Sequence, residues 1–158
     1  MDTSEIIASA ALLAALAGLV FTGMQIRYNS AVQRGMLYKD LYERFLTDPE
    51  FHYVYGLIEK DEDIFEPRFG AATEEEFRAR QFAVERLFAH FEVICSLHNR
   101  GLLTSEDMKS FNYAIERVAK HKGFSEYEAR LKNWRLQRKV SRGPYDTLFS
   151  YVSSNLDV

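Results

Sequence analysis

Apolar residues run without a charge through the N-terminal part of the chain. Residues 6–26, IIASAALLAALAGLVFTGMQI, contain no Asp, Glu, Lys or Arg. At a helical rise of about 1.5 Å per residue, this stretch reaches about 31 Å, which matches a hydrocarbon core of about 30 Å. The alternatives are a cleaved signal peptide and a buried core helix. A signal peptide has a basic leader and a shorter apolar run, whereas residues 1–5 are acidic, so the pattern predicts a retained transmembrane helix.

The charges that flank this span predict its orientation. No Lys or Arg precedes it, whereas Arg27, Arg34 and Lys39 follow it. The positive-inside rule then places the N-terminus outside and the rest of the chain in the cytoplasm. We therefore expect a transmembrane anchor over residues 1–27 and a cytoplasmic helical domain over residues 28–158.

Small residues recur at every fourth position within the span. A ridge of this kind lets two helices approach closely in lipid. It predicts that the anchor pairs with a second copy or with a partner span, while an alanine-rich helix also produces such spacing by chance. The ridge consists of Ala10, Ala14, Gly18 and Thr22.

After the span, the spacing of apolar residues stays helical, so the anchor helix is expected to continue through residues 28–45. Asp48 followed by Pro49 is a start signal for a second helix that reaches about Glu59. The acidic stretch from there to Thr73 has no sustained period and reads as a loop. Its acids lack the spacing of a calcium-binding loop.

A capping box at Thr73 to Glu76 opens the longest helix of the soluble part, which is expected to end at Gly101. The apolar residues on two flanks predict that little of this helix meets water, so it is expected to form the centre of the domain. The main stripe is Phe77, Val84, Leu87, Phe88, Phe91, Ile94 and Cys95, and the second flank is Phe82, Ala89 and Val93.

Three further helices follow in the pattern. Thr104 or Ser105 caps one that stops at Gly123, and a second capping box begins at Ser125. Gly143 and Pro144 then break the chain before a last amphipathic piece over residues 145–152. No stretch alternates with the period of a strand, and only three prolines occur. The expected fold class is all-α, with a single N-terminal transmembrane helix followed by a small helical bundle domain.

Residues capable of catalysis or metal binding are few and scattered. The single cysteine, Cys95, lies in the apolar stripe, where a thiol is usually inert. No phosphate-binding loop, dinucleotide fingerprint or nucleophile elbow occurs. Only His90 and His98 are predicted to lie on roughly one face of the same helix, and two imidazoles without a third ligand make no zinc site. We therefore expect no metal, no cofactor and ordinary hydrogen-bonded histidines. The four histidines are His52, His90, His98 and His121.

The strongest functional signal is a basic segment without any acid, residues 130–142. It fits a surface that rests on anionic lipid, a clasp with the acidic segment over residues 59–76, or a phosphate-binding surface for nucleic acid. The near-neutral charge of the cytoplasmic part makes nucleic acid the least favoured partner. A solvated helix face is the fourth interpretation. The candidate contact residues are Arg130, Lys132, Trp134, Arg135, Arg138, Lys139 and Arg142.

Several short motifs occur in the same order as in a known group of proteins. They are Tyr-x-x-Phe-x-x-Asp-Pro-Glu-Phe over residues 42–51, Asn-Arg-Gly-Leu-Leu over residues 99–103, Trp134 with its basic run, and Pro-Tyr-x-x-Leu-Phe over residues 144–149. With the N-terminal span, they resemble a family of uncharacterised bacterial membrane-tethered helical proteins. The resemblance implies an inner-membrane location and supplies no catalytic residue.

The sequence therefore favours a membrane-anchored interaction or regulatory module without evident catalysis. Its expected partners are membrane lipid, an unidentified protein and a second copy of the chain through the ridge. The alternative is a hydrolase or nucleic-acid-processing enzyme with a site assembled from scattered residues. The residues proposed for such a site are Glu85, Arg86, His90 and Glu92.

Overall fold

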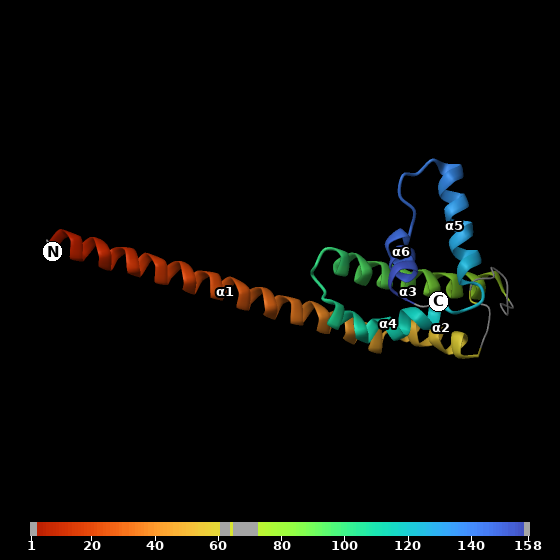
Figure 1. Cartoon of the computed structure of the whole chain (residues 1–158). Coiled ribbons are helices and arrows are strands. Elements are labelled where there is room, and N and C mark those ends of the chain that lie inside the picture. The colour runs from red at the N-terminus through yellow and green to blue at the C-terminus, as the bar shows by residue number, and fades with distance from the viewer. Residues whose placement is uncertain (1–2, 61–63, 65–72, 157–158) are drawn as a thin grey trace. The chain divides into compact units, whose positions relative to one another are not determined.

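The computed structural model describes residues 3–60, 64 and 73–156, with side chains from residue 15 onwards. Within these residues the chain is helical and contains no strand (Figure 1). The all-α fold class is therefore confirmed for the described part of the chain. Most of the predicted acidic loop, including the acids considered for calcium, lies outside the described residues.

The chain divides into two compact units, Met1–Lys39 and Asp40–Val158. Helix α1 spans Thr3–Thr47 and confirms the predicted helical continuation beyond the apolar stretch. Side chains from residue 15 to residue 36 are exposed. Among the described residues, no helix has both the length and the apolar character needed to cross a bilayer. The first part of the predicted span, residues 6–14, lies outside the described side chains, and the transmembrane anchor stays a prediction.

Helix α2, Pro49–Glu59, begins and ends where the sequence predicted. Asp48 caps it, because its Oδ1 accepts the Glu50 N–H at 2.9 Å. The other carboxylate oxygen accepts a hydrogen bond from Arg86 Nη2 at 2.8 Å, and Arg86 Nη1 lies 2.5 Å from Glu50 Oε2. One guanidinium on the next helix thus joins both acids at the start of α2.

Helix α3, Glu74–Asn99, is the centre of the second unit and packs against α2, α4 and α6 (Figure 1). Thr73 caps it as predicted, with its Oγ1 3.1 Å from the Glu76 nitrogen. Gly101 follows with φ of 72°, the left-handed conformation that glycine adopts without strain. The predicted stripe is buried except at Phe77, and its fully buried members are Leu87, Phe88, Phe91, Ile94 and Cys95.

The prediction for the second flank of this helix was wrong. Phe82 is 60% exposed and Val93 48%, and Ala89 between them is also exposed. The three residues share one side of α3 because they are spaced by seven and four positions. The surrounding helices cover the opposite side only, so α3 keeps one apolar strip in solvent.

Helix α4, Ser105–Ala119, starts with a complete capping box. Thr104 Oγ1 accepts the Asp107 N–H at 3.2 Å, and Asp107 Oδ2 accepts the Thr104 N–H at 2.7 Å. Thr104, and not Ser105, is therefore the capping residue. The core side chains of this helix are Met108, Phe111, Ile115 and Val118.

Helix α5, Phe124–Arg138, starts one residue before the predicted cap, so Ser125 lies inside the first turn. The reason is the packing of Phe124, whose ring lies 6.0 Å from that of Phe88 and 5.5 Å from that of Phe149. Burial of this aromatic ring determines the helix start, and no side chain caps it.

Helix α6, Asp146–Asn155, follows the predicted break at Gly143 and Pro144. Tyr145 precedes it with φ of 62°, which is strained for a residue with a side chain. The ring of Tyr145 packs 5.5 Å from that of Phe88, and its hydroxyl donates to the Glu85 carbonyl at 3.3 Å. These contacts hold the unusual backbone in place.

We predict that Phe88→Ala lowers the free energy of unfolding by about 3–5 kcal/mol, because it empties the point where α3, α5 and the start of α6 meet. Phe82→Ala on the exposed side of the same helix is the matched control and should change stability by less than about 0.5 kcal/mol. Urea denaturation followed by circular dichroism measures both. Equal losses in the two variants would contradict the assignment of the core.

Candidate functional site

Helix α5 carries most of the predicted basic surface and is largely exposed to solvent. Phe124 at its first turn is its only buried residue. Further along, Trp134 is 44% exposed, Leu136 69% and Val140 42%. Figure 1 shows that α5 extends away from the other helices of its unit. A helix with large apolar side chains in water, and little packing to explain them, is a candidate contact surface.

The bases of α5 alternate with these apolar residues along the helix. Arg130, Trp134 and Arg138 are spaced by four and therefore form one exposed stripe. Lys132 and Leu136 form a second stripe on another side. Each stripe sets an apolar side chain beside long basic ones, which is the chemistry that suits the boundary between water and lipid.

Two of the predicted contact residues instead hold the turn between α5 and α6. Arg135 Nη1 lies 2.9 Å from Asp146 Oδ2, and the same oxygen accepts the Gly143 N–H at 2.8 Å. Arg142 Nη2 donates to Thr147 Oγ1 at 2.9 Å. These two arginines are therefore structural residues as well as members of the basic surface.

Two of the remaining bases make contacts within α5. Lys132 Nζ lies 2.5 Å from Glu128 Oε1, one helical turn earlier. The guanidinium carbon of Arg130 lies 5.6 Å from the centre of the Tyr127 ring, a cation–π contact. Arg138 and Lys139 at the end of α5 are exposed. Trp134, Arg138 and Lys139 are thus the members of the surface most available to a partner.

The described acids of the segment over residues 59–76 pair elsewhere. Glu59 lies 3.9 Å from Arg117, and both Glu74 and Glu76 pair with an arginine four positions later, at 3.3 Å and 3.0 Å. Glu75 is exposed, and the remaining acids of that segment lie outside the described residues. The clasp between the acidic and basic segments stays a prediction.

The four residues of the alternative enzyme site do not converge. Arg86 bonds to acids at the start of α2, and His90 packs among Phe45 and Phe51. Glu92 instead accepts the N–H groups of residues 147 and 148, at 3.3 Å and 2.7 Å, and so caps α6. Glu85 accepts a hydrogen bond from Gln81 at 2.9 Å. Each of the four has a structural partner, and these partners lie on different elements of the fold, that of Glu85 on α3 itself.

His90 is the most unusual of these groups. It is 7% exposed, its ring lies parallel to that of Phe45 with centroids 6.3 Å apart, and its Nε2 has no hydrogen-bond partner. Burial lowers the pKa of His90 from 6.5 to about 4, and the charge of Arg44 acts in the same direction. The imidazole is therefore neutral at pH 7. A hydrogen bond with the Leu41 backbone agrees with the expected hydrogen-bonded histidine, whereas Nε2 has no partner.

The other histidines and the cysteine have ordinary structural roles. His52 Nε2 lies 2.6 Å from the Leu46 carbonyl, and His98 Nδ1 lies 3.0 Å from the Leu103 carbonyl. Burial raises the pKa of Cys95 to about 12, and the charge of Glu92 contributes. Such a thiol is a poor nucleophile. Among the described side chains, no three His, Cys, Asp or Glu residues gather to hold a metal ion.

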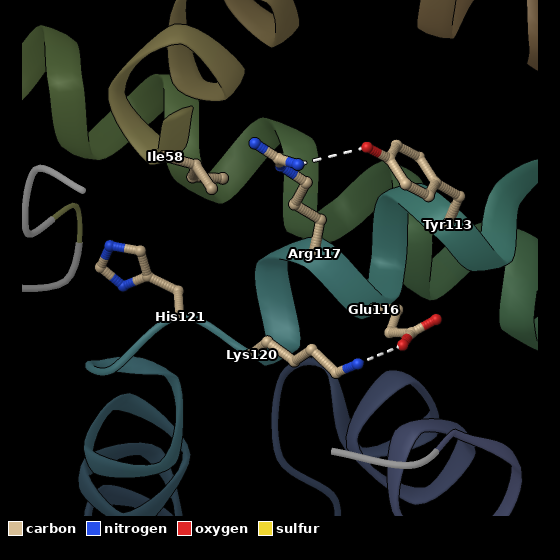
Figure 2. A pocket seen from close by; sticks show the side chains of 6 residues that line it. All are labelled: Ile58, Tyr113, Glu116, Arg117, Lys120 and His121. Carbon is tan, nitrogen blue, oxygen red and sulfur yellow. Dashed lines mark hydrogen bonds and ion pairs between the residues drawn. The ribbon is translucent and has the colours of Figure 1, made fainter. Parts of the chain in front are cut away.

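A pocket of about 370 Å³ lies between α2 and α4, and the sequence analysis did not identify it. Figure 2 shows the Arg117 guanidinium between the side chains of Tyr113 and His121. The spacing of 113, 117 and 121 is a four-residue repeat that places all three on one side of α4 and its C-terminal turn. This repeat is the sequence signal that could have revealed the pocket. Its lining residues are Ile58, Tyr113, Glu116, Arg117, Lys120 and His121.

Half of the predicted transmembrane ridge falls on described side chains. Gly18 and Thr22 lie on α1, and the Thr22 hydroxyl donates to the Gly18 carbonyl at 2.8 Å. No atom lies within 4 Å of a Cβ placed on Gly18. The side chains of Ala10 and Ala14 lie outside the described ones, so helix pairing through the ridge stays a prediction.

The lowered pKa of His90 predicts that acid destabilises the domain. The unfolded chain binds a proton near pH 6.5 and the folded one only near pH 4, so stability present above pH 6.5 is lost as the pH falls toward 4. The full loss is on the order of 3 kcal/mol. His90→Phe should flatten the decline between pH 6.5 and 5. Urea denaturation at several pH values measures this, and an unchanged slope in the variant would contradict it.

Comparison of this chain with known proteins found no match. No family model, curated protein or solved structure matches it. The resemblance to bacterial membrane-tethered helical proteins therefore stays a prediction. Function has to be argued from the residues of the chain itself.

Proposed function

We propose that this chain is a membrane-tethered, non-enzymatic interaction module that uses α5 as its contact surface. The proposal combines a transmembrane anchor over residues 6–26 with a helical domain on the cytoplasmic side of an inner membrane. A second copy of the chain, paired through the ridge of Ala10, Ala14, Gly18 and Thr22, is the proposed oligomeric partner.

The observation that carries the proposal is the exposure of α5. The helix buries only Phe124, yet it holds Trp134 at 44% exposure and a set of bases that includes Arg138 and Lys139. Exposed apolar surface of this size is costly unless a partner covers it. Bases beside a tryptophan match an anionic lipid surface, where each base contributes about 1 kcal/mol.

Charge distribution supports lipid over the other partners. The chain carries a net charge of −3 overall, so its attraction to an anionic surface has to come from a local basic region. The segment over residues 130–142 provides six bases and no acid. An anchor would hold this segment near the inner leaflet, where the surface potential is negative and acts over about a Debye length.

The roles of the polar residues on α3 support a non-enzymatic function. Arg86 joins Asp48 and Glu50 at the start of α2, and Glu92 caps α6. These groups already have hydrogen-bond or ion-pair partners within the fold. A reacting substrate would have to compete with those bonds, so the proposal assigns them to stability.

The anchor predicts that the intact chain stays with membranes. After cell disruption and an alkaline carbonate wash, which removes peripheral proteins, we expect the full-length chain in the pellet and its release only by detergent. Substituting Leu13 and Leu16 by Arg should move it to the supernatant or to aggregates, because charges at the centre of a span oppose insertion. Recovery of the unaltered chain in the carbonate supernatant would contradict the tether.

The lipid contact of α5 is testable through Trp134, the single tryptophan of the chain. The full-length protein is placed in nanodiscs of phosphatidylcholine, with or without phosphatidylglycerol, that carry brominated acyl chains. We expect quenching of Trp134 fluorescence only with the anionic lipid. In Arg138→Gln/Lys139→Gln the equilibrium for lipid contact should weaken roughly 30-fold, since two bases contribute about 2 kcal/mol.

The control is Arg78→Gln/Lys109→Gln, which removes two exposed bases far from the tryptophan in sequence and should keep the quenching. Equal quenching in neutral and anionic nanodiscs would contradict an electrostatic contact. Absence of quenching in both, with Trp134 still accessible to iodide, would show that α5 stays in water and would contradict the lipid contact.

A further inference from the structure

The pocket between α2 and α4 contains hydrogen-bond donors that have few partners within the fold. Arg117 is its central residue. Nη1 of Arg117 donates to the Tyr113 hydroxyl at 3.2 Å, and Nη2 lies 3.9 Å from Glu59 Oε1, at the limit of an ion pair. A guanidinium has five N–H donors. These two contacts use a minority of them, and the side chain of Glu59 is 65% exposed.

A buried hydroxyl lies close to the same arginine. The Tyr55 side-chain oxygen is buried and has no hydrogen-bond partner. Burial raises the pKa of Tyr55, the charge of Arg117 opposes this rise, and Tyr113 adds to it, which shows that the three groups are electrostatic neighbours. A hydroxyl without a partner in the protein interior is destabilising, because it has lost its bonds to water.

The other charges around the pocket leave room for an anion. Lys120 Nζ lies 2.5 Å from Glu116 Oε1, so these opposite charges offset each other (Figure 2). Glu59 is the only other described acid that we find paired with a lining residue. His121 lines the pocket and is 8% exposed. Apart from the offset pair, donors therefore outnumber carboxylates on the pocket wall.

We propose that this pocket binds a small oxyanion, a phosphate or carboxylate group, with Arg117 as its main ligand and the hydroxyl of Tyr113 as a further donor. An oxyanion presents several acceptors at once, and a guanidinium binds such groups in a two-pronged geometry. The anion would displace the loosely held Glu59 carboxylate. The site lies on helices other than α5, so it goes beyond the proposed lipid contact.

The test titrates the full-length protein in a non-ionic detergent with inorganic phosphate at constant ionic strength, followed by calorimetry. Glycerophosphoglycerol, the soluble headgroup of phosphatidylglycerol, forms a second arm that separates a lipid source from a free anion. We expect saturable binding of phosphate. Arg117→Gln should weaken it at least tenfold, because the bonds to a charged group are lost.

Two further variants keep the proposal falsifiable if Arg117→Gln fails to fold. Glu59→Gln removes the competing carboxylate at an exposed position and should tighten binding several-fold. Tyr113→Phe removes a lining hydroxyl and should weaken binding a few-fold. Arg100→Gln, an exposed arginine after α3, is the matched control and should bind as the unaltered protein does.

The outcomes separate this site from the lipid surface. Arg138→Gln/Lys139→Gln should bind phosphate normally, whatever its behaviour in nanodiscs. A heat signal that chloride abolishes at equal ionic strength, or binding that is unaffected by both Arg117→Gln and Glu59→Gln, would overturn the proposal. Binding of glycerophosphoglycerol but not phosphate would assign the pocket to a lipid headgroup.

Discussion

Burial of one side of α3 is the constraint on which the rest of the second unit depends. Leu87, Phe88, Phe91 and Ile94 are fully buried and meet side chains from α2, α4 and α6. Each of the neighbouring helices is short, between 10 and 15 residues, and helices of this length are marginal in isolation. They are stable here because they share the apolar surface of the 26-residue α3.

The polar residues of α3 also stabilise the neighbouring helices. Arg86 pairs with the two acids at the start of α2, and Glu92 accepts two backbone N–H groups at the start of α6. Helix starts leave N–H groups without partners, and α6 has no capping side chain of its own. A single helix therefore supplies both the apolar contact and the electrostatic caps of its neighbours. Because these charged residues bond to different parts of the fold, they resemble a catalytic set in sequence but do not form one site in space.

Two regions do not contribute to this core. Helix α5 meets the core through Phe124 and Tyr127 in its first turn and beyond them exposes bases and apolar residues. The pocket beside Arg117 contains a guanidinium with few partners within the fold. Residues retained in positions that do little for stability are where binding function is expected. The two proposals rest on these two regions, which lie on different helices and can be tested independently.

The sequence by itself determined the helices and most of their ends, because local signals act over a few residues. Asp48 with Pro49, Thr73 and Gly101 each mark a boundary that the structure confirms. The all-α class and the main stripe of α3 follow from the spacing of apolar residues in the same way. The role of the apolar stretch at residues 6–26 as a membrane anchor remains a prediction from the sequence.

Only the tertiary structure decided which apolar residues are covered and which polar ones are paired. Phe82 and Val93 fit a buried pattern but stay in solvent, because no helix packs on their side of α3. Phe124 overrode the local cap at Ser125, since burial of an aromatic ring is worth more than one capping bond. Arg117 and Tyr55 lie 62 positions apart, and their proximity depends on how α2 and α4 pack. The spacing of apolar residues shows which face of a helix can be buried, whereas the helices that bury it come from distant parts of the chain.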